Sequence, residues 1–179
     1  MLAKIFPKKE LFGMDFTSSA IEILSLLKHR LSYNINGYKF DFCKPDYKLK
    51  IKPNSAVFTF AALEQIGNRH KDFIKYLIDN NPDVVIHMEP IVELYDDENL
   101  LDYLSKCFHE KRQYLCGLLP YLRKLALDEK LQIDKVKRLY LGNHNHEAYT
   151  LIVWHPLKEN MDANRCKSRS TYEKGKISV

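Results

Sequence analysis

The stretch that decides the fold is Ser55-Ala56-Val57-Phe58-Thr59-Phe60-Ala61-Ala62-Leu63-Glu64-Gln65-Ile66-Gly67. Its first half is an apolar strand, and its second half is a polar turn that leads into a short helix. A second strand, Val84 to Pro90, also ends in charged and rigid residues. Because ligands of open α/β sheets bind beyond the carboxyl ends of parallel strands, these two strand ends predict a small-molecule site.

Upstream of this centre, strands and helices alternate. Glu10–Phe16 is predicted to form a short strand that ends in a carboxylate. Thr17 or Ser18 can cap the helix that follows, which the helical spacing of its apolar residues carries to Leu31. Gly37–Phe42 alternates and predicts a further strand.

Downstream, His70–Asn80, Asn99–Glu110 and Gln113–Leu127 are predicted to be helices. Val136–Leu141 and Ala148–Trp154 are apolar and β-rich, and the turn residues between them predict an antiparallel hairpin. The order β-α-β-β-α-β-α-α-β-β predicts an α/β fold with a mostly parallel sheet and a C-terminal antiparallel hairpin.

Length and charge limit the possible classes of protein. The 179 residues, 45% of them hydrophobic, can bury one core, and we expect one domain over residues 1–156. The net charge of +5 mixes 28 basic with 23 acidic residues, a balance too even to indicate a nucleic-acid partner. Much of the excess lies in residues 157–179, which lack apolar periodicity and are expected to form a basic, disordered tail.

The cysteines and the apolar runs predict a cytoplasmic location. Cys43, Cys107, Cys116 and Cys166 form no CxxC pair, so neither a zinc site nor a disulfide framework is indicated. His144 and His146 sit in a turn without a carboxylate or cysteine to complete a metal site. No apolar run approaches the roughly 18–20 residues of a membrane span. We therefore expect no metal and no membrane partner.

With these elements in place, the chain resembles a class I S-adenosylmethionine-dependent methyltransferase over about Leu2 to Pro156. Gly13-Met14-Asp15-Phe16-Thr17-Ser18 resembles the family's strand end that binds the ribose hydroxyls, and Phe40-Asp41-Phe42 sits where the family places residues beside the adenine. Phe58-Thr59-Phe60 and Ala62–Ile66 match the strand and loop that face the methyl donor and the substrate. The two segments of the predicted hairpin match the family's terminal hairpin.

The first elements of the family's fold have no counterpart in this sequence. The family's first strand and glycine-rich loop should precede Leu11, yet Gly13 is the first glycine, and Ala3-Lys4-Ile5-Phe6-Pro7 resembles the end of the helix that follows that loop. The expectation is an incomplete Rossmann-like methyltransferase fold. In the family the missing strand lies between the one ending at Asp15 and the one ending at Phe60. A homo-oligomer or a missing N-terminal fragment would fill its place.

The resemblance implies S-adenosylmethionine as cofactor and assigns roles to individual residues. Asp15, Asp41, Phe42, Thr59 and Phe60 would bind the cofactor, although Asp15 could instead cap the next helix and strand-end acids such as Asp41 are common.

Catalytic and substrate-binding roles fall on four further side chains. Glu64 and His87 are the candidate catalytic residues. Alternatively, Glu64 is an acid in the first turn of a helix that interacts with the helix dipole, and His87 is a residue of the core. Glu89 and Tyr114 are candidate substrate ligands, and Tyr114 could equally pack or lie exposed. Strand alternation would place His87 and Glu89 on one face.

The leading function is methyl transfer to a small-molecule or sugar acceptor, or a truncated remnant of that activity. One alternative is a non-catalytic subunit that uses the methyltransferase-like sheet. Another is a nucleotide-binding α/β protein of a different kind, which lacks a phosphate-cradling motif here. A nucleic-acid binder acting through the basic tail comes last.

A stability prediction follows from the missing strand. Such a strand buries roughly four or five apolar side chains at about 1.5–3 kcal/mol each, or about 10 kcal/mol in all. That sum is comparable to the roughly 5–15 kcal/mol net stability of a whole domain. We expect the isolated chain to be marginally stable or associated. Calorimetry with sedimentation checks this, and a cooperative melt of a monomer would contradict it.

Overall fold

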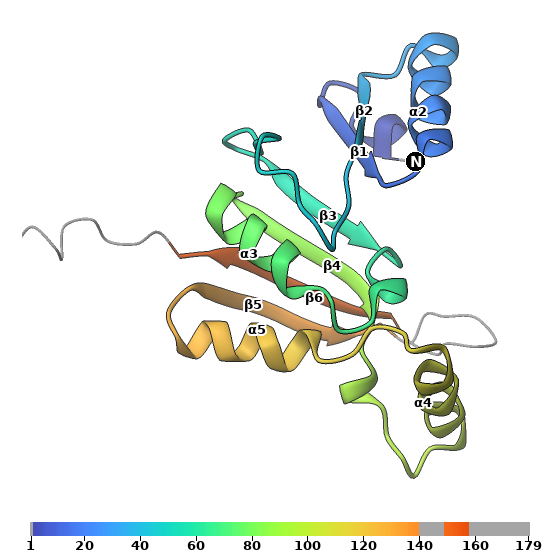
Figure 1. Ribbon diagram of the computed structural model, residues 1–179, viewed down its shortest axis with the longest axis vertical. Helices are drawn as coiled ribbons and strands as arrows, with labels where there is room; N and C mark the ends of the chain where they lie inside the picture. The colour runs from blue at the N-terminus through green and yellow to red at the C-terminus, as the bar shows by residue number, and fades with distance from the viewer. Residues whose placement is uncertain (1, 140–148, 158–179) are drawn as a thin grey trace, which may run out of the picture.

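The computed structural model describes residues 2–139 and 149–157 of the chain, which form two units (Figure 1). The N-terminal unit holds a short helix and a β-α-β motif. Its elements are α1 (Leu2–Ile5), β1 (Leu11–Asp15), α2 (Ser18–Leu31) and β2 (Ile35–Lys39). Thr17 is the N-cap of α2, because its side-chain oxygen accepts a hydrogen bond from the Ala20 amide at 3.4 Å.

The larger unit contains four strands, three α-helices and two 3-10 turns. Its elements are β3 (Ala56–Phe60), η1 (Glu64–Ile66), α3 (Lys71–Asn80), β4 (Val84–Pro90), η2 (Val92–Leu94), α4 (Leu100–Arg112), α5 (Leu118–Leu127), β5 (Leu131–Arg138) and β6 (Tyr149–Pro156). Leaving aside α1 and the 3-10 turns, the order of elements is the predicted one.

The strands form two sheets, and the break lies between β1 and β3, where the incomplete fold expected from the sequence has its missing strand. β1 and β2 pair in parallel, and the larger sheet has the order β3-β4-β6-β5. In the larger sheet β3 and β4 are parallel, whereas β6 runs antiparallel to both β4 and β5. Within the described residues, β1 and β3 therefore each have one edge without a β partner.

One face of the larger sheet is covered by helices and holds the core. Cross-strand neighbours on this helix-covered face include the row Val57, Val85, Trp154 and Ile133. These side chains pack with residues of α3 and α5, which lie on the same side of the sheet in Figure 1 (Phe73, Ile74, Leu77, Leu118, Leu119 and Leu122). α5 tolerates Pro120 because this residue falls in the first turn, where no intrahelical amide bond is required.

The opposite face of the larger sheet, here called the open face, is apolar but is not buried. It carries two cross-strand rows, Phe58–Ile86–Val153 and Phe60–Met88–Leu151. Phe58 and Phe60 expose 47% and 50% of their surface, and the other four side chains are half-buried. Two of the three strand pairings in this sheet are antiparallel, and such sheets can leave one face in contact with solvent.

The N-terminal unit is held together by the approach of α2 to two glycines. A Cβ on Gly13 would lie 2.5 Å from a methyl carbon of Leu24, and a Cβ on Gly37 would lie 3.2 Å from Ile21 and Leu24. Both glycines thus serve helix-to-sheet packing, because a larger residue would push α2 away.

The two units meet through a cluster of aromatic rings. Phe40, directly after β2, is 5% exposed and packs against Tyr76 and Phe73 of α3, with ring centroids 5.1 and 6.1 Å away. Its amide also donates to the carbonyl of Asp15 at 2.8 Å. A second contact joins Lys52, shortly before β3, to Glu10 at 2.6 Å.

Several predicted boundaries were wrong. The strand predicted over Gly37–Phe42 ends at Lys39, because the Asp41 side chain accepts the Cys43 amide at 2.8 Å and begins a turn. The helix predicted from Gln113 begins at Leu118, since Gln113 takes a left-handed conformation that ends α4. The strand predicted from Val136 begins at Leu131.

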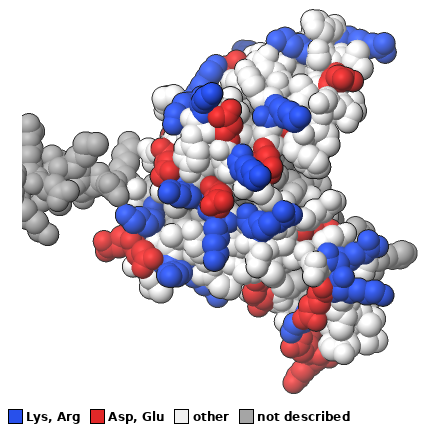
Figure 2. Space-filling model, in the orientation of Figure 1, with Lys and Arg blue, Asp and Glu red and all other residues white. Residues whose placement is uncertain are grey.

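Some sequence predictions cannot be compared with the structure. The hairpin turn with His144 and His146, and residues 158–179 of the predicted tail, lie outside the described residues. In the part of the chain that is described, no helix has the length and apolar character needed to cross a membrane. Charged side chains of both signs are interspersed over the face of the molecule that Figure 2 shows.

Phe40 should determine how firmly the two units are joined. We expect Phe40→Ala to lower the free energy of unfolding by about 3–5 kcal/mol, because it empties a packed site between the rings of α3. Urea denaturation measures this change. The control Phe16→Ala removes a ring that is 68% exposed and should change stability by less than about 0.5 kcal/mol. Equal effects of the two substitutions would show that the aromatic cluster does not join the units.

Candidate functional site

The candidate site begins with two side chains on the helix-covered face, near the carboxyl ends of β3 and β4. Thr59 and His87 are cross-strand partners, and both are buried. The Thr59 hydroxyl and His87 Nδ1 lie 2.9 Å apart and share a hydrogen bond. This contact joins residues 28 positions apart and fixes the orientation of the imidazole.

His87 is enclosed in the core. Its ring is fully buried and lies 6.1 Å from the ring of Trp154. Burial lowers the pKa of His87 to about 3, so the ring stays neutral at physiological pH. In this position His87 has no contact with solvent, and its side chain is hydrogen-bonded to Thr59. The geometry therefore suits a positioning role better than the catalytic role predicted for His87.

Glu89 lies two residues further along β4, on the same face as His87, as strand alternation predicted. It is fully buried, and its Oε1 accepts the Ala62 amide at 3.1 Å, while Oε2 has no partner at normal hydrogen-bond geometry among the residues that the structure describes. Burial raises the pKa of Glu89 to about 7, with the nearby Glu64 carboxylate contributing in the same direction. A carboxyl group with this pKa can exchange a proton near neutral pH.

Glu89 belongs to a polar row that continues across the sheet. Its cross-strand neighbour is Thr150 of β6, whose neighbour is Arg138 of β5. Arg138 forms two hydrogen bonds to the buried carboxylate of Asp102 in α4 and stacks over the Tyr95 ring at 5.1 Å. Hydrogen bonding to Arg138 lowers the pKa of Asp102, so this pair stays charged and fixes α4 beside the strand ends.

Glu64 lies at the start of η1, in the turn after β3. It is 9% exposed, and its carbonyl accepts the Leu115 amide at 2.7 Å, which ties η1 to the segment before α5. The pKa of Tyr149 is raised by burial and by the charges of Glu64 and Glu89. The Phe60 ring lies 5.2 Å from the Tyr149 ring and is exposed. Glu64, Glu89, Tyr149 and Phe60 are thus gathered at one end of the larger sheet.

Asp15 lies at the corresponding end of β1. Its Oδ1 accepts hydrogen bonds from the Thr17 amide at 2.7 Å and the Thr17 hydroxyl at 2.6 Å, and these bonds lower the pKa of Asp15. Thr17, and not Asp15, provides the helix cap. Asp15 is therefore an ionised, partly exposed carboxylate, which suits the acceptance of hydroxyl protons from a cis-diol.

The remaining predicted residues have other partners. Phe42 packs at 4.6 Å against Phe73, within the aromatic cluster that joins the two units. Asp41 is exposed at the turn after β2. Tyr114 lies in the linker between α4 and α5, where its ring contacts Phe108 and His109, so it does not belong to a helix as expected.

Sequence reasoning missed Tyr95, Tyr149 and the Arg138–Asp102 pair. The two charged residues are 36 positions apart, and neither belongs to a recognisable motif. The acidic loop before α4 was the one local signal, because Asp102 also accepts the amide of Asp96 within it at 2.9 Å.

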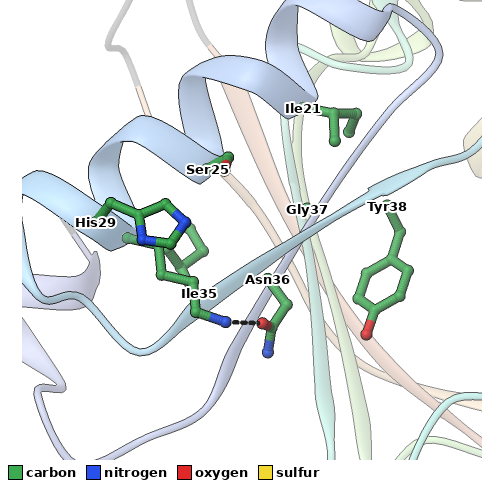
Figure 3. Close-up of a pocket in the computed structure, with 8 residues that line it drawn as sticks. Ile21, Ser25, His29, Ile35, Asn36, Gly37 and Tyr38 are labelled. Atoms are coloured by element: carbon green, nitrogen blue, oxygen red, sulfur yellow. Dashed lines mark hydrogen bonds between the residues drawn. The ribbon is translucent and has the colours of Figure 1, made fainter.

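A separate hollow of about 350 Å³ lies between α2 and β2 (Figure 3). Ser25 and His29 line it from the helix, and Asn36 and Tyr38 from the strand, where Lys28 Nζ donates to Asn36 Oδ1 at 2.6 Å. None of the predicted site residues lines this hollow, so it is not part of the candidate site.

The side chains present fit only part of S-adenosylmethionine. The Asp15 carboxylate has the chemistry to accept the ribose hydroxyls. The described glycines do not form a glycine-rich loop for the methionine part: Gly13 and Gly37 face α2, Gly67 faces the Gln113 carbonyl, and Gly117 faces the His70 ring. The described residues thus match the adenosine end of the cofactor and leave its methionine end without a backbone cradle.

No protein-family model and no curated protein sequence matches the chain. The match lies in three-dimensional structure, where the arrangement of strands and helices is that of the class I S-adenosylmethionine-dependent methyltransferase fold, and the resemblance inferred from sequence is confirmed at the level of the fold.

Three solved structures illustrate the match. LepI in complex with SAM aligns with a TM-score of 0.58 at 9% identity, over 87% of this chain and 39% of LepI. The methyltransferase domain of bacterial CtHen1-C aligns with a TM-score of 0.52 at 16% identity, over 88% and 84%. The YcgJ protein from Bacillus subtilis aligns with a TM-score of 0.54 at 10% identity, over 88% and 87%. This chain spans well under half of LepI.

The raised pKa of Glu89 makes stability depend on pH. The folded-state pKa of about 7 lies above the unfolded value of about 4.3. This group therefore stabilises the fold below the unfolded pKa, and the contribution is lost as pH rises through 7. We compare the free energies of unfolding of the wild type and of Glu89→Gln. The wild-type value minus the variant value is expected to fall by about 3 kcal/mol between pH 4.5 and 7.5. Urea denaturation across this range measures it.

The comparison with Glu89→Gln is essential, because buried histidines titrate in the same range with the opposite sign. Burial lowers the pKa of His70, so its contribution to stability is lost as pH falls. Subtracting the variant removes this background. A difference that stays constant with pH would show that Glu89 is ionised throughout, contrary to the site described above.

Proposed function

We propose that this chain carries the acceptor-side part of an S-adenosylmethionine-dependent methyltransferase domain, acting on a hydroxyl group of a small molecule or a sugar. The observation that carries the proposal is the buried Glu89, with its pKa near neutrality, at the strand ends of a fold that in LepI is seen in complex with SAM. Neighbours of low sequence identity support only the fold, so the chemistry rests on the side chains of this chain.

The bound cofactor would supply an electrophilic methyl group on a sulfonium. Asp15 would accept the ribose hydroxyls through its partly exposed carboxylate, held in place by Thr17. Asp41 and Phe42, directly after β2, would lie toward the adenine. Thr59 and Phe60 would lie at the strand end nearest the substrate, with Thr59 on the helix-covered face and Phe60 on the open face. These contacts would orient the reactants, which is the main source of rate in such a transfer.

Glu64 and Glu89 would handle the proton of the acceptor hydroxyl. The buried Glu89 carboxyl, whose pKa is raised to about 7, can hold a proton near neutral pH, and the Glu64 side-chain oxygens can accept a hydrogen bond from the acceptor hydroxyl. Glu64, nearer the surface, would contact the acceptor directly, and Glu89 would provide the group that titrates near pH 7. His87 would hold the Thr59 side chain in place through their hydrogen bond. Tyr114, in the linker before α5, would contribute to substrate binding.

Cofactor binding should depend on the Asp15 carboxylate. We expect S-adenosylmethionine to bind the chain weakly and Asp15→Asn to reduce the affinity at least about tenfold, since a hydrogen bond to a charged group contributes about 1.5–3 kcal/mol. Equilibrium dialysis with labelled cofactor measures this loss.

The matched control is Asp46→Asn, because the Asp46 carboxylate also accepts a backbone amide two residues along, from Lys48 at 2.9 Å, but is not at a strand end. It should bind as wild type does. Equal affinities of wild type and Asp15→Asn would remove Asp15 from the cofactor site, and tight binding by the unmodified chain would contradict the missing cradle.

A second candidate function is a non-catalytic subunit that associates through its sheet. The unpaired edges of β1 and β3 and the apolar open face favour it. In this case the predicted homo-oligomer, or a separate N-terminal fragment, would supply the partner. Loss of methyl transfer in Glu64→Gln and Glu89→Gln, with folding retained, distinguishes the first function from the second.

A further inference from the structure

We propose that the outer edge of β2, beside the hollow between α2 and β2, binds an extended acidic peptide segment as an added strand. This site takes no part in the proposed methyl transfer, because none of the residues assigned to that reaction lines the hollow. The inference rests on three features of the described residues. These are the backbone groups on the edge of β2, the hollow beside this edge, and the positive charge around it.

The outer edge of β2, on the side away from β1, presents backbone amides that have no partner. The Phe40 amide, directly after β2, donates to the Asp15 carbonyl of β1 at 2.8 Å. Because successive residues of a parallel strand direct their backbone groups to opposite sides, the amides of Gly37 and Lys39 point away from β1. Neither amide has a hydrogen-bond partner among the residues that the structure describes. Both can therefore donate to an added strand.

The residue types of β2 leave this edge open to pairing. β2 (INGYK) has no charged residue before Lys39, and it pairs with β1 without a bulge. By contrast, β5 (LQIDKVKR), at the outer edge of the larger sheet, has four charged residues and a shift of register. Charges and bulges are the usual protection of a strand edge against pairing. The chain thus protects the edge of β5 and leaves the edge of β2 unprotected.

The hollow of about 350 Å³ gives the side chains of an added strand a place to bind (Figure 3). Ile35 and Gly37 line it from β2, and Ile21, Ser25 and His29 line it from α2. Exposed sheet edges bind extended peptides through main-chain hydrogen bonds, and pockets beside the edge select alternate side chains of the peptide. β2 and the hollow together have both parts of such a site.

The charges around the hollow favour an acidic side chain. Lys28 Nζ donates to Asn36 Oδ1 at 2.6 Å, which holds the ammonium group beside β2 and leaves two of its three N–H groups available. His29 adds a ring nitrogen donor. No acidic residue is among those that line the hollow in the described part of the chain. Glu10, which accepts from Asn36 Nδ2, is paired with Lys52. A glutamate or aspartate of the added strand would therefore bind Lys28 without a competing acid.

Amide hydrogen exchange of the intact chain, followed by NMR, tests the proposal. The probe is a synthetic peptide of roughly seven residues, capped at both ends, in which glutamate and valine alternate. We expect saturating peptide to slow exchange of the Gly37 and Lys39 amides at least about tenfold, because the added strand accepts both. The amides of β5, at the other outer edge, are internal controls and should not change.

Two control peptides separate backbone pairing from charge. The same peptide with every amide N-methylated keeps its carboxylates but has no backbone donors, so it should not protect Gly37 and Lys39. A peptide with lysine in place of glutamate keeps the backbone donors but reverses the charge. It should bind at least about tenfold more weakly than the glutamate peptide.

Charge reversal in the chain gives the reciprocal test. Lys28→Glu should weaken binding of the glutamate peptide and strengthen binding of the lysine peptide. The matched control is Lys124→Glu, because Lys124 lies in the last turn of α5 as Lys28 lies in the last turn of α2. It should leave both affinities unchanged. Unchanged amide signals of β1 show that the N-terminal unit of each variant is folded, and the control peptides need no substitution at all.

Four results would overturn the proposal. These are no protection of Gly37 and Lys39, equal protection by the N-methylated peptide, equal affinity for the glutamate and lysine peptides, and protection that rises with the concentration of the chain alone. The last result, together with a dimer in sedimentation, would assign the edge to a second copy of this chain. None of these measurements involves the cofactor, so the proposal and the methyl-transfer function can fail separately.

Discussion

The constraint that governs this molecule is the hydrogen bonding of parallel strands, which need a neighbour on each side. β4 has such neighbours in β3 and β6, and the best-buried side chains of the sheet lie on and around it. β1 and β3 have a neighbour on one side only, and both carry exposed aromatic or apolar side chains, Phe12 and Met14 in β1 and Phe58 and Phe60 in β3. The core lies on the helix-covered face of β4 and β6, whose side chains on that face are fully buried.

Much of the fold follows from local sequence signals. β3 lies in the apolar first half of the stretch that predicts it, and Thr17 caps α2, which ends at Leu31 as predicted. These elements have strong periodicity and clear caps. The strand predicted over Gly37–Phe42 failed because Phe40 and Phe42 alternate as strand residues do, yet they pack into the aromatic cluster with α3. The strand predicted from Val136 starts too late, because a bulge in β5 shifts the register between Ile133 and Lys135 and breaks the alternation of apolar residues.

The candidate site could be predicted only in part. His87 and Glu89 share a face because strand alternation requires it, and Thr59 joins them through the register of β3 with β4. The degree of burial was not visible in the sequence, and it decides their chemistry: it keeps His87 neutral and raises the pKa of Glu89. The Arg138–Asp102 pair depends on a tertiary contact of α4 with β5, and the acidic loop before α4 does not indicate its basic partner 36 positions away.

The aromatic cluster around Phe40 has a thermodynamic consequence. Asp15 and the acids near Glu64 belong to different units, which this cluster, the Asp15–Phe40 backbone bond and the Lys52–Glu10 pair hold together. A ligand that contacts both units therefore contributes free energy to their association. Any polypeptide bound between the same units does likewise, so each would raise the affinity of the other by the same factor, as reciprocity between linked equilibria demands.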